Sequence, residues 1–516
     1  MVSGRAPAVL RPEHPVPRPL AELLAVFPIS VVRGDPADVN VSGVTLSTDD
    51  VRAGDLYVGV PGRHRHGAEF AAAAIGSGAA AVLTDAAGAD LAGEVDVPLL
   101  LVEDPRAALG EVSAWVHRSD EQPPLLIGVT GTNGKTSTAY LLDAVLRQLG
   151  LVCGLSTTAE RRLGELTVSS SLTTPEASET HALLARAREL GVQAMTIEVS
   201  AQALTRHRVD GIVFDVAGFT NLSHDHLDDY ADMEEYFQAK AALFSPTRAR
   251  RGVVCTDTSW GERLAAESEI PVTTIGSLDG AADWRVEILE ETQASTTFAV
   301  TGPNGIELRT GIPVIGRHMA MNAGLAIAMI VEAGVEVERL AHSLHERSID
   351  AYLPGRLERV SGDEGPSVFV DFAHSPDAFV STLAALRRVT PGRIIMMFGA
   401  DGDRDTTKRA DMGRVAAEGS DLLIITDFDS RTEDPAAIRR ALLDGARTAV
   451  DGAEIIEVAS PEEAIRLAVR RAAFGDSILW AGPGHQDYRE VGGVKHPHSA
   501  RDEARAALRD AGWPAR

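Results

Sequence analysis

Short apolar runs separated by turn-forming residues repeat along the whole chain. In the first 120 residues, the apolar runs at 41–44, 55–60 and 80–84 predict strands. The run at 70–75 predicts the beginning of a helix, which the Gly and Ser residues at 76–78 end. This part of the chain is therefore expected to form a small α/β unit.

The remaining chain predicts two further units in which buried strands alternate with helices. The strand candidates are 125–129, 195–199, 214–219, 252–255, 368–371, 394–398, 422–426 and 478–481. Leu141, Leu142, Val145, Leu146 and Leu149 repeat at helical spacing. Fully apolar strands interleaved with helices imply a mainly parallel sheet that is covered on both faces.

Two breaks divide this pattern, one at Glu121-Gln122-Pro123-Pro124 and one at Leu353-Pro354-Gly355. We therefore expect an α/β protein of three domains, whose central domain has a mainly parallel sheet and whose C-terminal domain is doubly wound. The expected domains are 1–122, 123–352 and 353–516. The first 18 residues are rich in Pro and Arg and predict a mobile leader.

The charge and the composition of the chain exclude some classes of binding partner. The 516 residues carry a formal net charge of −25, which argues against nucleic acid or an anionic membrane as the partner. The two cysteines, Cys153 and Cys255, have no metal-type spacing and build no disulfide framework. We find no signal sequence and no apolar run long enough to span a bilayer. The expected location is the cytoplasm.

The strongest single motif is the stretch 128–137, with the sequence GVTGTNGKTS. It follows an apolar strand and opens an amphipathic helix, which is the context of a phosphate-binding P-loop. Its glycines let backbone N–H groups converge on phosphate oxygens. Lys135 can reach the β- and γ-phosphates, and the Thr136 hydroxyl can hold Mg²⁺. Val129 replaces the first glycine of the strict pattern. The alternative is a Gly-rich turn with an exposed lysine.

This loop resembles that of the Mur ligases, and a similar loop occurs in their relatives, the folylpolyglutamate synthetases. Three further stretches resemble Mur motifs: Glu198-Val199-Ser200, Asn221 to Asp228 (NLSHDHLD), and Glu235 to Lys240 (EYFQAK). The resemblance implies that Thr136 and Glu198 hold one Mg²⁺ and that His226 holds a second. Lys240 matches the family's carbamylated lysine. The catalytic residues implied are Lys135, Glu198, His226 and Lys240.

The resemblance extends to the binding of ATP and of a UDP-linked substrate. The implied ATP-binding residues are Gly131, Thr132, Asn133, Gly134, Lys135, Thr136, Ser137, Asn322, Arg356 and Asp371. The implied UDP-sugar-peptide-binding residues are Ser47, Thr173, Thr174, Ser200 and Arg208. Two motifs depart from the family pattern: EVSSH is Glu198-Val199-Ser200-Ala201-Gln202 here, and Asp-Ser-Arg is Ser47-Thr48-Asp49.

The third domain carries a stretch similar to the MurE-type GxGGDRDxxKR, at Gly399 to Arg409. The amino-acid-binding residues implied are Arg404, Asp429, Arg431 and Gln486. The DNPR signature of enzymes that add meso-diaminopimelate is Phe428-Asp429-Ser430-Arg431 here, and GKGHE ends in Gln486. Two arginines suit a carboxylate. Asp429 offers one negative charge, which suits a lone side-chain ammonium.

The resemblance implies a monomeric, ATP-dependent ligase with three binding domains, for UDP, for ATP and for the amino acid. It would form an acyl phosphate on UDP-MurNAc-L-Ala-D-Glu and add a free amino acid as the third residue of the peptidoglycan precursor. Lysine, ornithine or diaminobutyrate is the expected third residue, and meso-diaminopimelate is the alternative. The other candidate functions are a folylpolyglutamate synthetase, the ligase that adds D-Ala-D-Ala, and a nucleotide-binding regulatory module without catalysis.

Overall fold

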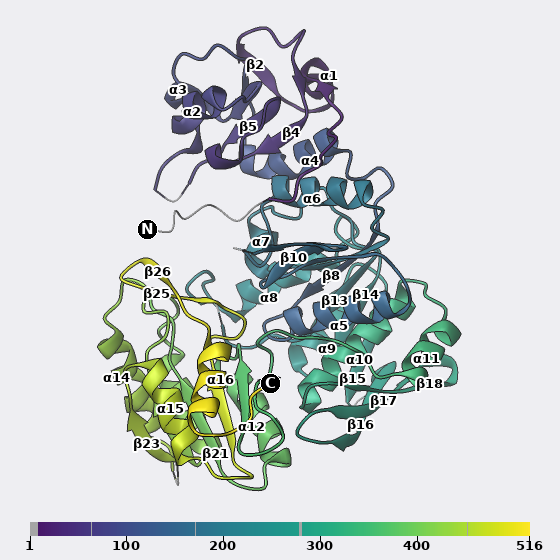
Figure 1. The fold of residues 1–516 in the computed structure, drawn as a ribbon. Helices are drawn as coiled ribbons and strands as arrows, with labels where there is room; N and C mark the ends of the chain where they lie inside the picture. The colour runs from purple at the N-terminus through teal and green to yellow at the C-terminus, as the bar shows by residue number, and fades with distance from the viewer. Residues whose placement is uncertain (1–8, 63, 171, 226, 278–280, 451) are drawn as a thin grey trace.

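The computed structural model describes residues 9–516, apart from 63, 171, 226, 278–280 and 451. The chain forms an N-terminal unit (9–117), a central unit (125–346) and a C-terminal unit (355–516), each with its own main sheet. Figure 1 shows the N-terminal unit at the top and the C-terminal unit beside the lower part of the central one. The expected α/β class is confirmed.

The N-terminal unit is built on a five-stranded sheet with the order β2-β7-β6-β5-β4, in which only β2 is antiparallel to its neighbour. The strands of this unit are β1 (Arg18–Pro19), β2 (Ser30–Arg33), β3 (Asn40–Val41), β4 (Gly43–Thr45), β5 (Asp55–Gly59), β6 (Ala81–Thr84) and β7 (Leu99–Leu101). The helices are α1 (Leu20–Val26), η1 (Thr48–Asp50), η2 (Gly67–Phe70), α2 (Ala71–Gly76), α3 (Ala86–Leu91) and α4 (Pro105–His117). The predicted strand at 41–44 is therefore divided between β3 and β4.

The central unit has an eleven-stranded sheet with the order β11-β10-β9-β12-β8-β13-β14-β15-β16-β17-β18. Its strands are β8 (Leu125–Thr130), β9 (Cys153–Ser156), β10 (Glu160–Leu163), β11 (Leu166–Ser169), β12 (Ala194–Glu198), β13 (Val216–Phe219), β14 (Gly252–Cys255), β15 (Val272–Ser277), β16 (Trp284–Glu291), β17 (Thr296–Gly302) and β18 (Ile306–Ile312). In the order of the sheet, the neighbours from β9 through β12, β8, β13, β14 and β15 to β16 pair in parallel, and both ends of the sheet are antiparallel.

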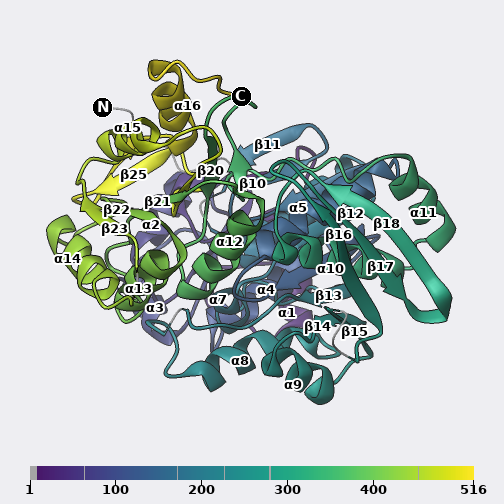
Figure 2. The same ribbon diagram turned by 90° about the horizontal axis from the view of Figure 1, so that it is seen from below.

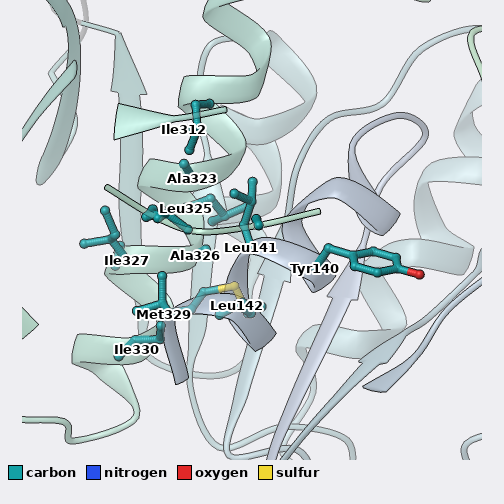
Figure 3. Close-up of a cluster of buried hydrophobic side chains, with 14 of the residues drawn as sticks. Tyr140, Leu141, Leu142, Ile312, Ala323, Leu325, Ala326, Ile327, Met329 and Ile330 are labelled. Atoms are coloured by element: carbon teal, nitrogen blue, oxygen red, sulfur yellow. The ribbon is translucent and has the colours of Figure 1, made fainter. Parts of the chain in front are cut away.

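Helices cover both faces of this sheet, as the fully apolar strands predict. The helices are α5 (Lys135–Gln148), α6 (Ala177–Glu189), α7 (Ala201–Thr205), α8 (Met233–Ala241), η3 (Ala242–Phe244), α9 (Ser259–Glu267), η4 (Pro303–Gly305), α10 (Arg317–Glu332) and α11 (Val337–Glu346). One core contains α5, α10 and α11, and the other contains α6 to α9. Figure 3 shows Leu141 and Leu142 of α5 beside Leu325 and Met329 of α10. This packing holds the N-terminus of α5 in place.

The C-terminal unit is doubly wound, with the strand order β19-β20-β24-β21-β22-β23. Its strands are β19 (Glu358–Arg359), β20 (Ser367–Asp371), β21 (Ile394–Phe398), β22 (Leu422–Ile425), β23 (Glu454–Glu457), β24 (Ser477–Ala481), β25 (Tyr488–Val491) and β26 (Val494–Pro497). Helices α12 (Pro376–Val389), α13 (Arg409–Gly419) and α14 (Pro435–Ala446) cover one face, and α15 (Pro461–Arg471) and α16 (Ala500–Asp510) the other. Ser375, Asp434 and Ser460 cap helices that have Pro in the first turn.

Several strands carry no clear alternation in the sequence and were not predicted. Among them are the hairpin β10–β11 and the run from β15 to β18, whose antiparallel end Figure 2 shows as long paired ribbons. Their exposed faces alternate polar and apolar residues irregularly, and β16 contains a register shift between Ile288 and Glu290. No helix in the described part of the chain is both long and apolar enough to cross a bilayer.

Residues 9–18, which belong to the segment expected to form a mobile leader, make contacts with two units. The Arg11 guanidinium is buried, with a side-chain exposure of 5%, and pairs with the Asp55 carboxylate, whose exposure is 1%. Glu13 pairs with Arg186 of α6, in the central unit. The guanidinium of Arg18 lies 3.6 Å from the centre of the Trp115 ring. Charged residues that suggest a solvated segment are therefore used in ion pairs.

Arg11→Ala tests this anchoring. Removing one partner leaves the Asp55 carboxylate buried without its cation, which typically costs about 3–5 kcal/mol. We expect the free energy of unfolding of the N-terminal unit to fall by that amount, measured by hydrogen exchange of the β5 amides. The control is Arg447→Ala, at a side chain that is 64% exposed, and it should change stability by less than about 0.5 kcal/mol. Equal exchange in both variants would contradict the anchoring.

Candidate active site

A single large cleft of about 1820 Å³ collects residues from all three units. Pro61, Gly62 and Arg106 line it from the N-terminal unit. The central unit contributes the loop between β8 and α5, and the C-terminal unit contributes the residues that follow β20 and β21. Residues that are hundreds of positions apart therefore share one cavity. Its centre is the candidate active site.

The backbone of the loop between β8 and α5 requires glycine at two positions. Gly131 has a φ of +144° and Gly134 a φ of +88°, in the region that side chains disfavour. A Cβ at Gly131 would lie 1.9 Å from Oγ1 of Thr220, and one at Gly134 would lie 2.6 Å from Oδ1 of Asn322. The loop is thus packed against the end of β13 and against α10. Thr132, Asn133, Lys135, Thr136 and Ser137 line the cleft, as do Gly134 and Asn322.

The first turn of α5 brings a cation and oxygen donors together. Nζ of Lys135 donates to the carbonyl oxygens of Gly131 (3.0 Å) and Thr132 (2.8 Å). Burial lowers the pKa of Lys135. Oγ1 of Thr136 donates to Oε2 of Glu198 at 3.0 Å. A hydroxyl and a carboxylate are the ligands that Mg²⁺ prefers.

The oxygen donors near the loop fit a divalent cation that is shared with phosphate. Within the described residues, no three His, Cys, Asp or Glu side chains gather as a metal site. A cation at Thr136 and Glu198 would therefore complete its shell with ligand oxygens and water, which is common for Mg²⁺. His226, the implied ligand of a second ion, lies outside the described residues.

Glu198 ends β12 and is positioned by two threonines, Thr158 and Thr174, of which only Thr174 was predicted as a site residue. Its carboxylate accepts hydrogen bonds from N (3.0 Å) and Oγ1 (3.1 Å) of Thr158, in the turn between β9 and β10. Oγ1 of Thr174 donates to the Glu198 carbonyl at 2.7 Å and accepts from the Ser200 N–H at 3.0 Å. Thr158 stands in no motif, so only its spatial position identifies it.

Lys240 is fully enclosed, with 1% exposure. Its Nζ donates to the Gly131 carbonyl at 2.7 Å and lies 4.3 Å from the centre of the Tyr236 ring. Burial, together with the nearby charge of Lys135, lowers the pKa of Lys240 well below its ordinary value. An uncharged amine is the form that can react with CO₂, since only the free lone pair is nucleophilic.

Arg356 crosses from the C-terminal unit to the phosphate loop. Its Nη2 donates to Oγ1 of Thr136 at 3.0 Å, and its guanidinium lies 4.3 Å from the centre of the Phe372 ring. Asp371 ends β20, accepts from the Leu357 N–H (3.0 Å) and from Oγ1 of Thr382 (3.2 Å), and lines the cleft. The predicted ATP-side residues therefore converge on one place, with the exception that Gly131 lies just behind the cleft surface.

A second bridge joins the two units through residues that were not predicted as site residues. Nζ of Lys408 lies 2.9 Å from Oδ1 of Asp225, and Nε2 of His374 lies 3.7 Å from Oδ2 of the same carboxylate. Asp225 belongs to the loop after β13. Its neighbours come from the loops that precede α12 and α13.

The predicted UDP-side residues divide into two groups. Thr173, Ser200 and Arg208 line the cleft, and Arg208 pairs with Glu176 at 3.1 Å. Ser47 and Thr174 are not among the lining residues. Ser47 instead caps η1, where its Oγ accepts the Asp49 N–H at 3.3 Å. The structure therefore gives Ser47 a capping role.

Arg404, Arg431 and Gln486 line the C-terminal wall of the cleft. Asp429, which was also predicted to bind the amino acid, is not among the lining residues. Its carboxylate is buried, with 1% exposure, and accepts the Glu490 N–H at 2.9 Å. Asp429 thereby ties the loop before Arg431 to strand β25. The sequence motif identified the position but not the direction of its side chain.

A P-loop, oxygen donors for a cation and a cleft between three α/β units define an ATP-dependent ligase. Family models of the Mur ligases match most of the chain. They are "Mur ligase family, catalytic domain" at 40–116, "Mur ligase middle domain" at 129–330 and "Mur ligase, glutamate ligase domain" at 355–484. The chain belongs to the Mur ligase family, and within it to the MurE type.

Relatives and solved structures agree with this assignment. The chain is 61% identical to the UDP-N-acetylmuramyl-tripeptide synthetase of Leifsonia xyli subsp. xyli, over 99% of this chain and 100% of the relative. It is 42% identical to the UDP-N-acetylmuramoyl-L-alanyl-D-glutamate–2,6-diaminopimelate ligase of Streptomyces coelicolor, over 98% and 99%. A solved diaminopimelate ligase structure superposes with a TM-score of 0.65 at 25% identity, covering 96% of this chain and 100% of the other.

Asp429→Asn tests the internal role of this carboxyl group. Burial raises the pKa of Asp429 to about 6, above the unfolded value of about 3.9. The folded state therefore binds the proton more tightly, and the wild type loses stability as pH rises from about 4 to about 6. Asn keeps an acceptor for Glu490 without the charge. We expect the variant to be more stable at pH 7.5 by up to about 3 kcal/mol.

The comparison is made by urea unfolding at pH 4 and at pH 7.5, and the difference between variant and wild type should disappear at the lower pH. The control is Asp444→Asn, at a side chain that is 66% exposed. It should stay within about 0.5 kcal/mol of wild type at both pH values. A difference for Asp429→Asn that does not depend on pH would show that its charge is not the cause.

Proposed function

We propose that this enzyme adds the third amino acid to UDP-MurNAc-L-Ala-D-Glu in peptidoglycan precursor synthesis. The observation that carries the proposal is the shared cleft, in which phosphate-loop residues lie between a wall from the N-terminal unit and a wall from the C-terminal unit. The printed names of the relatives, a tripeptide synthetase and a diaminopimelate ligase, support the same substrate. The enzyme acts as a monomer in the cytoplasm, where ATP is available.

The proposed domains are 1–122 for UDP binding, 123–352 for ATP binding and 353–516 for amino-acid binding. The carboxylate of D-Glu takes the γ-phosphoryl group of ATP and becomes an acyl phosphate. The amine of the incoming amino acid then displaces phosphate. A carboxylate is a poor acceptor until it is activated, so the protein contributes mainly positioning and positive charge. The ATP site comprises the loop residues 131–137 with Asn322, Arg356 and Asp371.

Two Mg²⁺ ions are the proposed cofactors. Thr136 and Glu198 would hold the first, and His226 and Lys240 support the second. Bound Mg²⁺ neutralises the phosphate and carboxylate oxygens that must approach one another. The low pKa and the burial of Lys240 favour its conversion to a carbamate, which would replace a buried amine by an anion beside the metal.

The proposed third residue is a diamino acid with a single side-chain ammonium: lysine, ornithine or diaminobutyrate. Arg404 and Arg431 suit its carboxylate. The Oε1 atom of Gln486 is a buried acceptor without a hydrogen-bond partner within the described structure, and it suits a donor such as an ammonium. Asp401 lies 3.9 Å from Arg431 on the same wall and is a second carboxylate that suits an ammonium.

Lys135→Ala tests the ATP site. The variant loses a charge-assisted contact to phosphate, which in a catalytic site is worth about 3–4 kcal/mol. We expect ligation to fall by about 10²–10³-fold or more, with unchanged thermal unfolding, because Nζ bonds only carbonyls of its own loop. Ligation is measured as phosphate release that requires both the UDP-linked dipeptide and an amino acid. If the folded variant releases phosphate at nearly the wild-type rate, the assignment of the ATP site is wrong.

An amino-acid panel tests the third residue and the rival functions. Lysine, ornithine, diaminobutyrate and meso-diaminopimelate are each offered with the UDP-linked dipeptide, and kcat/KM is compared. We expect one of the first three to lead, because burying a second zwitterionic head against Phe428 with unpaired groups costs about 1–3 kcal/mol for each group. A wide lead for meso-diaminopimelate contradicts the specificity. Turnover only with a folate and glutamate, or with D-Ala-D-Ala, contradicts the function.

A further inference from the structure

One imidazole in the cleft has a fixed tautomer and a free lone pair on the side of the reacting groups. His374 follows β20, lines the cleft and has a side-chain exposure of 32%. Its Nδ1 lies 2.7 Å from the carbonyl oxygen of Phe372. A carbonyl only accepts, so Nδ1 carries the proton and donates it. In the neutral ring, Nε2 is then the acceptor, and it faces Asp225.

The groups around His374 keep the ring neutral but are arranged to stabilise a proton once it arrives. Burial and the ammonium of Lys408 lower the pKa of His374, while Asp225, the Phe372 carbonyl and Asp401 act in the opposite direction. Arg404 is a further charged group on the same wall. Oδ2 of Asp225 lies 3.7 Å from Nε2, close enough to stabilise an imidazolium.

The ring also lies between the two halves of the reaction. Asp225 belongs to the central unit, and its charge acts on Lys135 and Lys240 beside the phosphate loop. Lys408, Asp401 and Arg404 belong to the wall where the amino acid is proposed to bind. His374 therefore borders both the residues of the central unit and the wall where the amino acid is proposed to bind.

We propose that His374 is the general base that takes a proton from the ammonium of the incoming amino acid. This inference rests on the proposed function. An ammonium has no lone pair and cannot attack, so one proton must leave before the new bond forms. Lys408 pairs with Asp225 at 2.9 Å, and Nε2 of His374 keeps a lone pair that can accept this proton, because Nδ1 is the protonated nitrogen of the ring.

The proton and the electron pairs balance in this step. The ammonium R–NH₃⁺ gives one proton to Nε2 and becomes an amine. The nitrogen lone pair forms the bond to the acyl carbon, and the bond from that carbon to the phosphate oxygen breaks. The second N–H proton leaves with the phosphate, which departs as HPO₄²⁻. Asp225 stabilises the imidazolium until it releases its proton to solvent.

Asp225 and Lys408 act as positioning residues and come from different units. The Asp225 carboxylate is held against Nε2 by Lys408, which is itself only 11% exposed. Asp225 can therefore stabilise the protonated His374 only when the C-terminal unit lies against the central unit. This arrangement links deprotonation of the amine to the closed form of the cleft.

The test separates formation of the acyl phosphate from attack by the amine. Hydroxylamine is uncharged at neutral pH, so it attacks an acyl phosphate without a general base and gives a hydroxamate. His374→Asn keeps an amide donor near the position of Nδ1 and removes Nε2. We expect ligation of the amino acid to fall by about 10²–10⁴-fold, while hydroxamate formation from ATP and the UDP-linked dipeptide stays near the wild-type rate.

The pH profile gives a second readout that a structural role would not change. The wild type should show an acid limb in kcat from protonation of His374. The variant should lose the part of the pH dependence that comes from the imidazole. Its remaining ligation should rise with pH only as the amine of the amino acid loses its proton. His374→Ala is measured in parallel, and His345→Gln, at an exposed site on α11, is the control.

Three results would overturn the proposal. Ligation at the wild-type rate in His374→Asn would show that Nε2 is not the base. An equal loss of hydroxamate and amide in both variants would give His374 a role in the first step or in folding. If kcat of His374→Asn falls at acid pH as that of the wild type does, a group other than His374 causes the fall. Failure of the wild type itself to form hydroxamate would instead contradict the proposed function, so the two failures are distinguishable.

Discussion

The site depends on the parallel pairing of β8 with β12 on one side and with β13 on the other. The register sets Glu198 opposite Val129 and Phe219 opposite Thr130. The carboxyl ends of the three strands therefore meet at one edge of the sheet, which is where ligands bind in folds of this kind. A carboxylate, the phosphate loop and Thr220 come together through backbone pairing alone. A slip of one residue in β12 would turn Glu198 to the other face.

This edge brings two lysine side chains together in a strongly acidic protein. The amines of Lys135 and Lys240 both donate to the carbonyl oxygen of Gly131, and burial lowers the pKa of each. Two buried amines at one carbonyl are costly unless an anion joins them. Phosphate oxygens and a carbamate would supply that charge. The net charge of −25 thus says little about the ligand, because the field at the loop is local.

Contacts between units decide which residues act together. Thr136 meets Arg356, and Asp225 meets Lys408, although 220 and 183 positions separate the members of the two pairs. Both contacts join the central unit to the C-terminal one. Both contacts therefore require that the two units lie against each other, so the composition of the site depends on how the units are docked.

The sequence by itself determined the order of strands and helices around the phosphate loop, and the residue types that the chemistry needs. Local signals carried this much: apolar runs, apolar residues at helical spacing, and the glycines of the phosphate loop. It did not predict β10, β11 or the antiparallel end of the large sheet, where pairing with neighbours outweighs a weak alternation.

Only the tertiary structure decided which way the motif residues face. Ser47 caps η1, Thr174 holds the backbone of Glu198 and Ser200, and Asp429 bonds the Glu490 N–H instead of facing the cleft. Thr158 donates a hydrogen bond to Glu198, although no sequence motif contains Thr158. A motif specifies a residue type at a chain position, but the direction of a side chain depends on hydrogen-bond partners that come from distant segments. Those partners exist only after the chain has folded.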